Sequence, residues 1–223
     1  MDRVSHHSLI GLCGVLGLFF LLLTSLVHAE ERPESMDLNA LKTRAAELQQ
    51  RLDQNPSDYD ALQGIGIIYH NMALKDSKTY TKKAVQYLEQ AYQKKPENNV
   101  VLCYLGCDYT LLAKDAWNPI SRLSNLNKGF AYMDKAVRMD PDNITVRLYR
   151  GNSSKALPKF LNRRSVAYED FEHLASLFEK KSYISASLKA SVYRNLAALY
   201  KEDGDPAKAR KYEAMAAAVE KEK

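Results

Sequence analysis

The chain has 223 residues, of which 46% are hydrophobic and 26% are charged, and its formal net charge is +5. This is the composition of an ordinary globular protein, so it excludes a disordered or low-complexity chain. The length is sufficient for one domain with its own buried core.

An uncharged, mostly apolar run covers residues 9–27 near the amino terminus. The sequence Val27-His28-Ala29 before Glu30 fits the small-x-small rule for cleavage of a signal peptide. The same run is also long enough to span a bilayer as an uncleaved anchor, so both alternatives stay open. In both cases Arg3 lies on the cytoplasmic side and the rest of the chain lies beyond the membrane.

These features predict three segments. We expect residues 1–29 to be a signal peptide or an N-terminal membrane anchor, residues 30–36 to be a linker, and residues 37–223 to be the folded domain. The domain is then extracytoplasmic: periplasmic after cleavage, or anchored to the inner membrane if the leader stays.

The first predicted helix carries a regular apolar stripe. Its members follow a 3, 4, 3, 4 spacing and are Leu38, Leu41, Ala45, Leu48 and Leu52. Such a stripe needs a partner surface, and the segment that follows is the nearest one.

Two stretches after this helix share one skeleton. The first is Ile65-Gly66-x-x-Tyr69, followed by Ala84, Leu88, Ala91 and Pro96, and the second is Leu105-Gly106-x-x-Tyr109, followed by Gly129, Met133, Ala136 and Pro141. The closing spacings of four, three and five residues are the same in both. Small residues allow two helices to approach closely, so each copy predicts a helical hairpin. Asn55-Pro56-Ser57-Asp58 and its counterparts near Pro96 and Pro141 predict the ends and starts of helices.

Two further copies follow. Leu196-Ala197-x-x-Tyr200, with Ala209 and Ala216 after it, keeps the spacing. Arg150-Gly151, completed by Ala167, Phe171 and Leu174, lacks the tyrosine and has an arginine in place of the apolar residue. The segment from Ala214 to Val219 predicts a capping helix with a solvated outer face.

The skeleton resembles that of the tetratricopeptide repeat (TPR) superfamily, in which Leu-Gly-x-x-Tyr, Ala-x-x-x-Phe and Pro recur with a period of about 34 residues. The resemblance covers residues 37–221. It implies an all-α fold, an α-solenoid of stacked helical hairpins with about 3.5 to 4 repeats.

The resemblance also implies a concave groove, lined by the first helix of each hairpin, that receives a peptide or a partner protein. Carried over position by position, the groove residues are Asp60, Gln63, Ile67, His70, Asn71, Val100, Cys103, Cys107, Thr110, Leu148, Asn152 and Arg194. Gln63 and Ile67 stand where the carboxylate-gripping members of the family have Lys and Asn, which disfavours that function. The alternative is that these side chains only cover a helix face and that binding occurs at an edge.

Cys103 and Cys107 are four residues apart on one face of a predicted helix. A disulfide along a regular helix is strained, and a metal site with His70 would have only three ligands. We therefore expect both cysteines to be small packing residues, with no metal and no cofactor.

A basic segment follows Asp142 and extends to Glu169 without an acidic residue. Its cations are Arg147, Arg150, Lys155, Lys159, Arg163 and Arg164. It can form a basic patch that contacts anionic lipid head groups or an acidic partner. The alternative is that Leu157, Phe160 and Leu161 pack into the core and the cations are simply solvated.

No catalytic motif and no nucleic-acid recognition motif accompanies these features, so we expect neither an enzyme nor a nucleic-acid-binding protein. The leading hypothesis is an exported TPR scaffold that binds a peptide or partner protein within a cell-envelope assembly. The alternative is a membrane-surface or assembly-factor module that docks through residues 147–164. Homo-oligomerisation remains open.

Overall fold

The computed structural model describes residues 36–180 and 184–221. Over these residues the chain is helical and has no strand, which confirms the predicted all-α class. The predicted leader, residues 1–29, lies outside the described residues, as does nearly all of the predicted linker. The helices are α1 (Leu38–Gln54), α2 (Tyr59–Ala73), α3 (Ser77–Lys94), α4 (Asn99–Asp115), α5 (Pro119–Met139), α6 (Ile144–Lys155), the short 3-10 helix η2 (Lys159–Leu161), α7 (Arg164–Lys180), α8 (Ala186–Glu202) and α9 (Pro206–Lys221).

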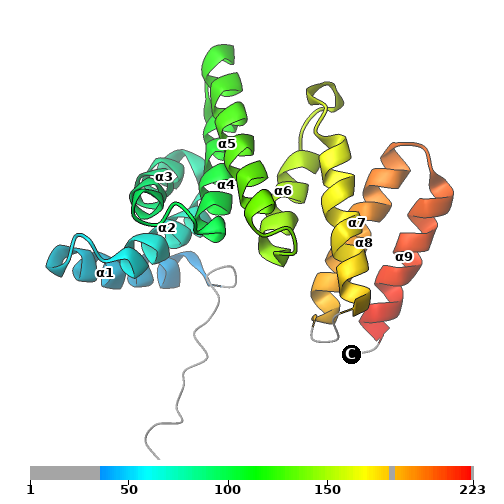
Figure 1. Ribbon diagram of the computed structural model, residues 1–223, viewed down its shortest axis with the longest axis horizontal. Helices are drawn as coiled ribbons and strands as arrows, with labels where there is room; N and C mark the ends of the chain where they lie inside the picture. The colour runs from blue at the N-terminus through cyan, green and yellow to red at the C-terminus, as the bar shows by residue number, and fades with distance from the viewer. Residues whose placement is uncertain (1–35, 181–183, 222–223) are drawn as a thin grey trace, which may run out of the picture. The chain divides into compact units, whose positions relative to one another are not determined.

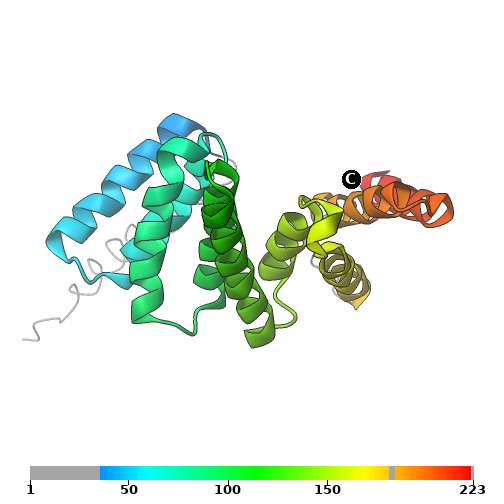
Figure 2. The same cartoon turned by 90° about the horizontal axis from the view of Figure 1, so that it is seen from above.

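The helices are arranged as hairpins stacked in chain order. Figures 1 and 2 show successive helices running back and forth, and each contacts the next. In addition, α2 contacts α4 and α4 contacts α6, so the first helices of these three hairpins form an inner row. Within the described residues, α2–α3, α4–α5, α6–α7 and α8–α9 make four hairpins preceded by α1. This confirms the predicted α-solenoid.

The predicted capping residues begin the inner helices. Asp58 Oδ1 accepts a hydrogen bond from the Ala61 amide at 3.0 Å at the start of α2. Asn98 Oδ1 accepts from the Val101 amide at 3.0 Å at the start of α4, and Asn143 caps α6 in the same way. Each cap satisfies amide groups that have no partner inside the helix.

The glycine of the first repeat lies at a close helix crossing, as its spacing predicts. A Cβ added to Gly66 would lie 2.7 Å from Leu88 Cγ on α3. The tyrosine three residues later fills the space beside this crossing, where its ring stacks against Tyr80 and Tyr87. The small-x-x-Tyr pattern therefore has the packing role expected of it.

The two end helices pack as predicted. Leu41, Ala45, Leu48 and Leu52 of α1 are buried, and α1 contacts α2. At the other end, α9 buries Ala209 and Ala216 and leaves most of its outer face exposed. None of the described helices has both the length and the hydropathy needed to cross a membrane.

Candidate functional site

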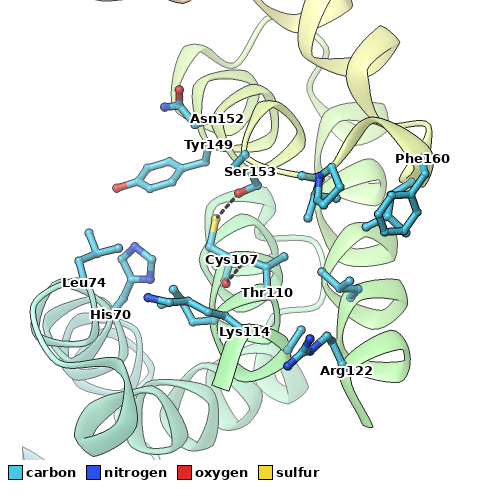
Figure 3. Close-up of a pocket in the computed structure, with 17 residues that line it drawn as sticks. His70, Leu74, Cys107, Thr110, Lys114, Arg122, Tyr149, Asn152, Ser153 and Phe160 are labelled. Atoms are coloured by element: carbon cyan, nitrogen blue, oxygen red, sulfur yellow. Dashed lines mark hydrogen bonds between the residues drawn. The ribbon is translucent and has the colours of Figure 1, made fainter. Parts of the chain in front are cut away.

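A large hollow lies on the side of the inner row, where α2, α4, α5, α6 and η2 meet. Its volume is about 780 Å³, and Figure 3 shows the side chains that surround it. We call it the pocket. It is large enough to receive several side chains of another molecule.

The wall of the pocket is mainly apolar. Leu111 and Leu126 come from α4 and α5, and Leu157 comes from the segment between α6 and η2. Leu74 and Phe160 lie on opposite sides of the opening and are 58% and 78% exposed (Figure 3). Large apolar side chains that remain exposed beside a hollow are typical of a binding site.

A buried polar pair lies behind one wall. His70 Nδ1 is 2.8 Å from Asp108 Oδ1, and both side chains are almost completely buried. The His70 ring also packs edge-on against Tyr104 and Tyr149, with centroid distances of 4.9 and 5.7 Å. Burial raises the pKa of Asp108, and its charge and hydrogen-bond interactions with His70 offset only part of that effect. The pair fixes α2 against α4 at the pocket.

Cys103 and Cys107 are both free thiols. Cys103 Sγ lies 3.8 Å from the carbonyl oxygen of Val146, and Cys107 Sγ lies 4.0 Å from Ser153 Oγ at the pocket wall (Figure 3). The hydrogen bond between the two thiols, together with burial, raises the pKa of Cys103, and the same hydrogen bond lowers the pKa of Cys107. The part of the chain that the structure describes contains no group of three or more His, Cys, Asp or Glu residues that could hold a metal.

The structure brings only part of the predicted groove together. Four of its members line the pocket: His70, Cys107, Thr110 and Asn152. Asn71 and Cys103 are buried and do not line the pocket, and Asn71 donates to the carbonyl oxygen of Ile67 at 2.9 Å. The remaining predicted residues lie outside the pocket wall, and their role stays a prediction: Asp60, Gln63, Ile67, Val100, Leu148 and Arg194.

Sequence reasoning missed much of the pocket wall. Leu74, Lys114, Arg122 and Phe160 lie at or near the turns inside the hairpins and not in the middle of the inner helices. The available signal was the set of apolar residues at these turns, where polar residues are usual.

The predicted basic patch is wrong for Arg147 and Arg150, which are each 6% exposed. Arg150 forms ion pairs with Asp170 at 2.7 Å, Glu169 at 2.8 Å and Asp134 at 3.1 Å. Arg147 pairs with the same Asp170 at 2.8 Å. These contacts join α6 to α5 and α7, so the two arginines belong to the packing between hairpins.

The other cations of this segment also have partners within the chain. Arg163 pairs with Asp134 at 2.8 Å, while Arg164 and Lys159 both pair with Asp203. Lys155 Nζ donates to Asn195 Oδ1 at 2.7 Å. The acidic partners come from distant parts of the sequence, which is why the local charge run did not reveal them.

The alternative expectation for this segment holds for Leu157, which packs against the core formed by α4, α5 and α6, and is wrong for Phe160. Phe160 is exposed and does not pack into the core. Lys159, Arg163 and Arg164 are paired with acids, and Lys155 is hydrogen-bonded to Asn195, so these cations are not simply solvated. The cations of the segment therefore stabilise the packing between helices, and its apolar residues Leu157, Phe160 and Leu161 line the pocket.

No protein-family model matches the chain, and no curated protein matches it in sequence. Solved structures do match. A thermophilic TPR protein of Thermus thermophilus, TTC0263, is 19% identical over 80% of this chain and 82% of its own, with a TM-score of 0.60.

Two structures of MamA are similar too. One is 13% identical over 84% of this chain and 96% of its own, with a TM-score of 0.59. The other, MamA of MSR-1, is 18% identical over 82% of this chain and 89% of its own, with a TM-score of 0.54. At these identities the likeness concerns the fold. The chain therefore has a TPR-like fold of stacked helical repeats.

Proposed function

We propose that this chain is an exported scaffold that binds a polypeptide partner in the pocket, as part of a cell-envelope assembly. The observation that carries the proposal is the mainly apolar hollow of about 780 Å³ with Leu74 and Phe160 exposed at its opening. Covering a large apolar side chain contributes about 1.5–3 kcal/mol, so a partner that covers both gains appreciable affinity.

The walls of the pocket are held rigidly by the core. Residues 101–109 of α4 are all buried, and α4 packs against α3, α5 and α6. Since the wall is formed before binding, little conformational entropy is lost when a partner enters. A preformed hollow supports binding better than a loop surface does.

The proposed envelope location rests on the apolar leader at residues 9–27 and the small-x-small sequence that follows it. The alternative of a basic membrane-docking segment is weakened by the ion pairs of Arg147, Arg150, Arg163 and Arg164, which neutralise it from within. We therefore propose the pocket as the site of interaction.

Affinity capture from envelope extract tests the site. The full chain carrying Leu74→Ser and Phe160→Ser should recover its partner at least about tenfold less well, because two exposed apolar contacts are lost. Both side chains are exposed, so the fold should be retained. A matched control, Ile120→Ser with Met139→Ser, removes two exposed apolar side chains outside the pocket. Equal recovery by the two double variants would refute the pocket as the binding site.

Export is tested separately with a reporter enzyme fused after Lys223 that is active only outside the cytoplasm. We expect an active reporter. An inactive reporter on a stably expressed fusion would refute export and leave the pocket proposal standing.

A further inference from the structure

We infer that the partner segment that enters the pocket combines large apolar side chains with acidic ones, and that Lys114 and Arg122 hold its carboxylates. This inference rests on the proposed function and adds the chemistry of the partner. The first observation is the charge of the pocket wall. It includes Lys114 and Arg122 and no Asp or Glu.

These two cations lie on neighbouring helices at one side of the opening. Lys114 is in the last turn of α4 and Arg122 is near the start of α5, and Figure 3 shows both side chains on the same side of the pocket. Both are exposed, and neither forms an ion pair with a described residue. Their charges are therefore available to an external anion.

The other cations beside the pocket differ in this respect. Lys159 is paired with Asp203 at 2.8 Å and Arg163 with Asp134 at 2.8 Å. An ion pair cancels most of the field of its members beyond short range, so Lys114 and Arg122 dominate the potential inside the pocket. A negatively charged segment is favoured there over a neutral or basic one.

Arg122 is held in place by a hydrogen bond to the backbone of the preceding turn. One of its guanidinium nitrogens, Nη2, donates to the carbonyl oxygen of Ala116 at 3.1 Å, across the turn between α4 and α5. A guanidinium has five N–H donors in a planar fork, so others remain for a ligand. A carboxylate matches that fork with two parallel hydrogen bonds.

The apolar part of the ligand has room to continue along α5. Leu126, Leu157 and Leu161 line both the pocket and a second hollow of about 300 Å³. The wall of this second hollow also includes Leu123 and Phe130 and, at its polar side, the ion pair of Asp134 and Arg163. Adjoining hollows receive successive side chains of a polypeptide. A flat layer of lipid head groups does not reach into them, so the shape favours a polypeptide over a membrane.

Selection from a random twelve-residue peptide display library on the immobilised full chain tests the inference. Among enriched peptides we expect an acidic residue beside an aromatic or aliphatic one about threefold or more above its frequency in the library. The variant Lys114→Glu with Arg122→Glu should lose this preference and enrich basic residues in its place. The control Lys42→Glu with Lys82→Glu makes the same change of net charge at exposed positions outside the pocket, and should keep the wild-type preference.

Each other outcome overturns the inference in a distinguishable way. Apolar peptides enriched without acidic residues, or the same peptides enriched by the charge-reversed variant, refute the acidic partner but leave the proposed function standing. No enrichment by the wild-type chain contradicts both. A third outcome would assign the two cations to a lipid surface instead. In that case no peptide is enriched, the full chain floats with phosphatidylserine vesicles but not with phosphatidylcholine vesicles, and the charge-reversed variant does not float.

Discussion

A Cβ added to Gly106 would lie 2.7 Å from the carbonyl oxygen of Gly129, and a Cβ added to Gly129 would lie 2.7 Å from the carbonyl oxygen of Gly106. The backbones of α4 and α5 therefore touch at this crossing. Backbone atoms cannot move aside as the end of a flexible side chain can. This contact holds together the two helices that carry Lys114 and Arg122.

The first prediction concerns this crossing. Gly106→Ala should lower the free energy of unfolding by about 1–3 kcal/mol, because the added methyl group forces α4 and α5 apart. The control is Gly64→Ala, where the nearest atom is the terminal Cδ1 of Leu48 at 3.1 Å. There the better helix propensity of alanine, up to about 1 kcal/mol, can offset the contact. Urea unfolding of both variants checks this, and equal destabilisation would contradict it.

The sequence predicts those parts of the fold whose interacting residues are close together along the chain. Gly66 and Gly106 predict the hairpins because each glycine contacts the next helix in the chain. The packing partners are therefore close in sequence, and the spacing of small residues reveals them. The helix starts at Asp58 and Asn98 are predictable for the same reason, since a cap depends on residues only two or three positions away.

The site is less predictable because its parts come together only in three dimensions. From the sequence alone the basic segment predicts an exposed patch, because its partners Asp134 and Asp203 lie elsewhere in the sequence and pair with it only in the folded chain. The pocket wall likewise depends on turns, such as those near Leu74 and Phe160, that lie far apart in the sequence. Local charge and periodicity carry no information about such pairings.

A second prediction concerns the ion pairs between α6 and α7. Asp170 is fully buried and bonds both Arg147 and Arg150. Asp170→Asn should lower the free energy of unfolding by about 3–5 kcal/mol, because two buried guanidinium groups lose their main counter-charge. Glu169→Gln changes a 57% exposed partner of the same arginines and should cost less than about 1 kcal/mol. If chemical denaturation gives both variants the same free energy of unfolding, the buried ion pairs of Asp170 do not stabilise the fold.

The third prediction is a pH dependence at Asp134. Burial alone would raise the pKa of Asp134, but the hydrogen bond from Arg163 and the charges of Arg163 and Arg150 outweigh it and lower the pKa below 3.8. The folded protein then binds fewer protons at Asp134 than the unfolded chain does near that pH. The stabilisation is therefore present above the unfolded pKa and is lost as the pH falls through the folded value.

Asp134→Asn tests this sign. The variant should be less stable than the wild type by about 2 kcal/mol near neutral pH, since hydrogen bonds between charged groups are lost. The difference should shrink as the pH falls below 3.8 toward the lowered pKa of the folded state, where the wild-type carboxyl becomes protonated. Urea unfolding at a series of pH values measures it. A difference that stays constant or grows on acidification would show that the pKa is not lowered.

The fourth prediction separates the two thiols. Both thiols are buried, but Cys107 lines the pocket, is 5% exposed and has a lowered pKa, whereas Cys103 lies outside the pocket wall, has no exposed surface and has a raised pKa. Because the thiolate is the reactive form, iodoacetamide should modify Cys107 about tenfold or more faster than Cys103 in the folded protein. Mass spectrometry of peptides from a time course checks the order, with the denatured protein as the control in which both react alike. Faster modification of Cys103 would contradict the arrangement of the pocket wall.

Site-specific photo-crosslinking in intact cells examines whether a polypeptide occupies the pocket. A photoreactive phenylalanine derivative at Asn152, which is exposed on the pocket wall, should give a discrete covalent adduct with another polypeptide. The same group at Lys82, which is exposed on α3 outside the pocket, should give none or far less. No adduct at Asn152, or equal adducts at the two positions, would contradict a polypeptide-binding pocket.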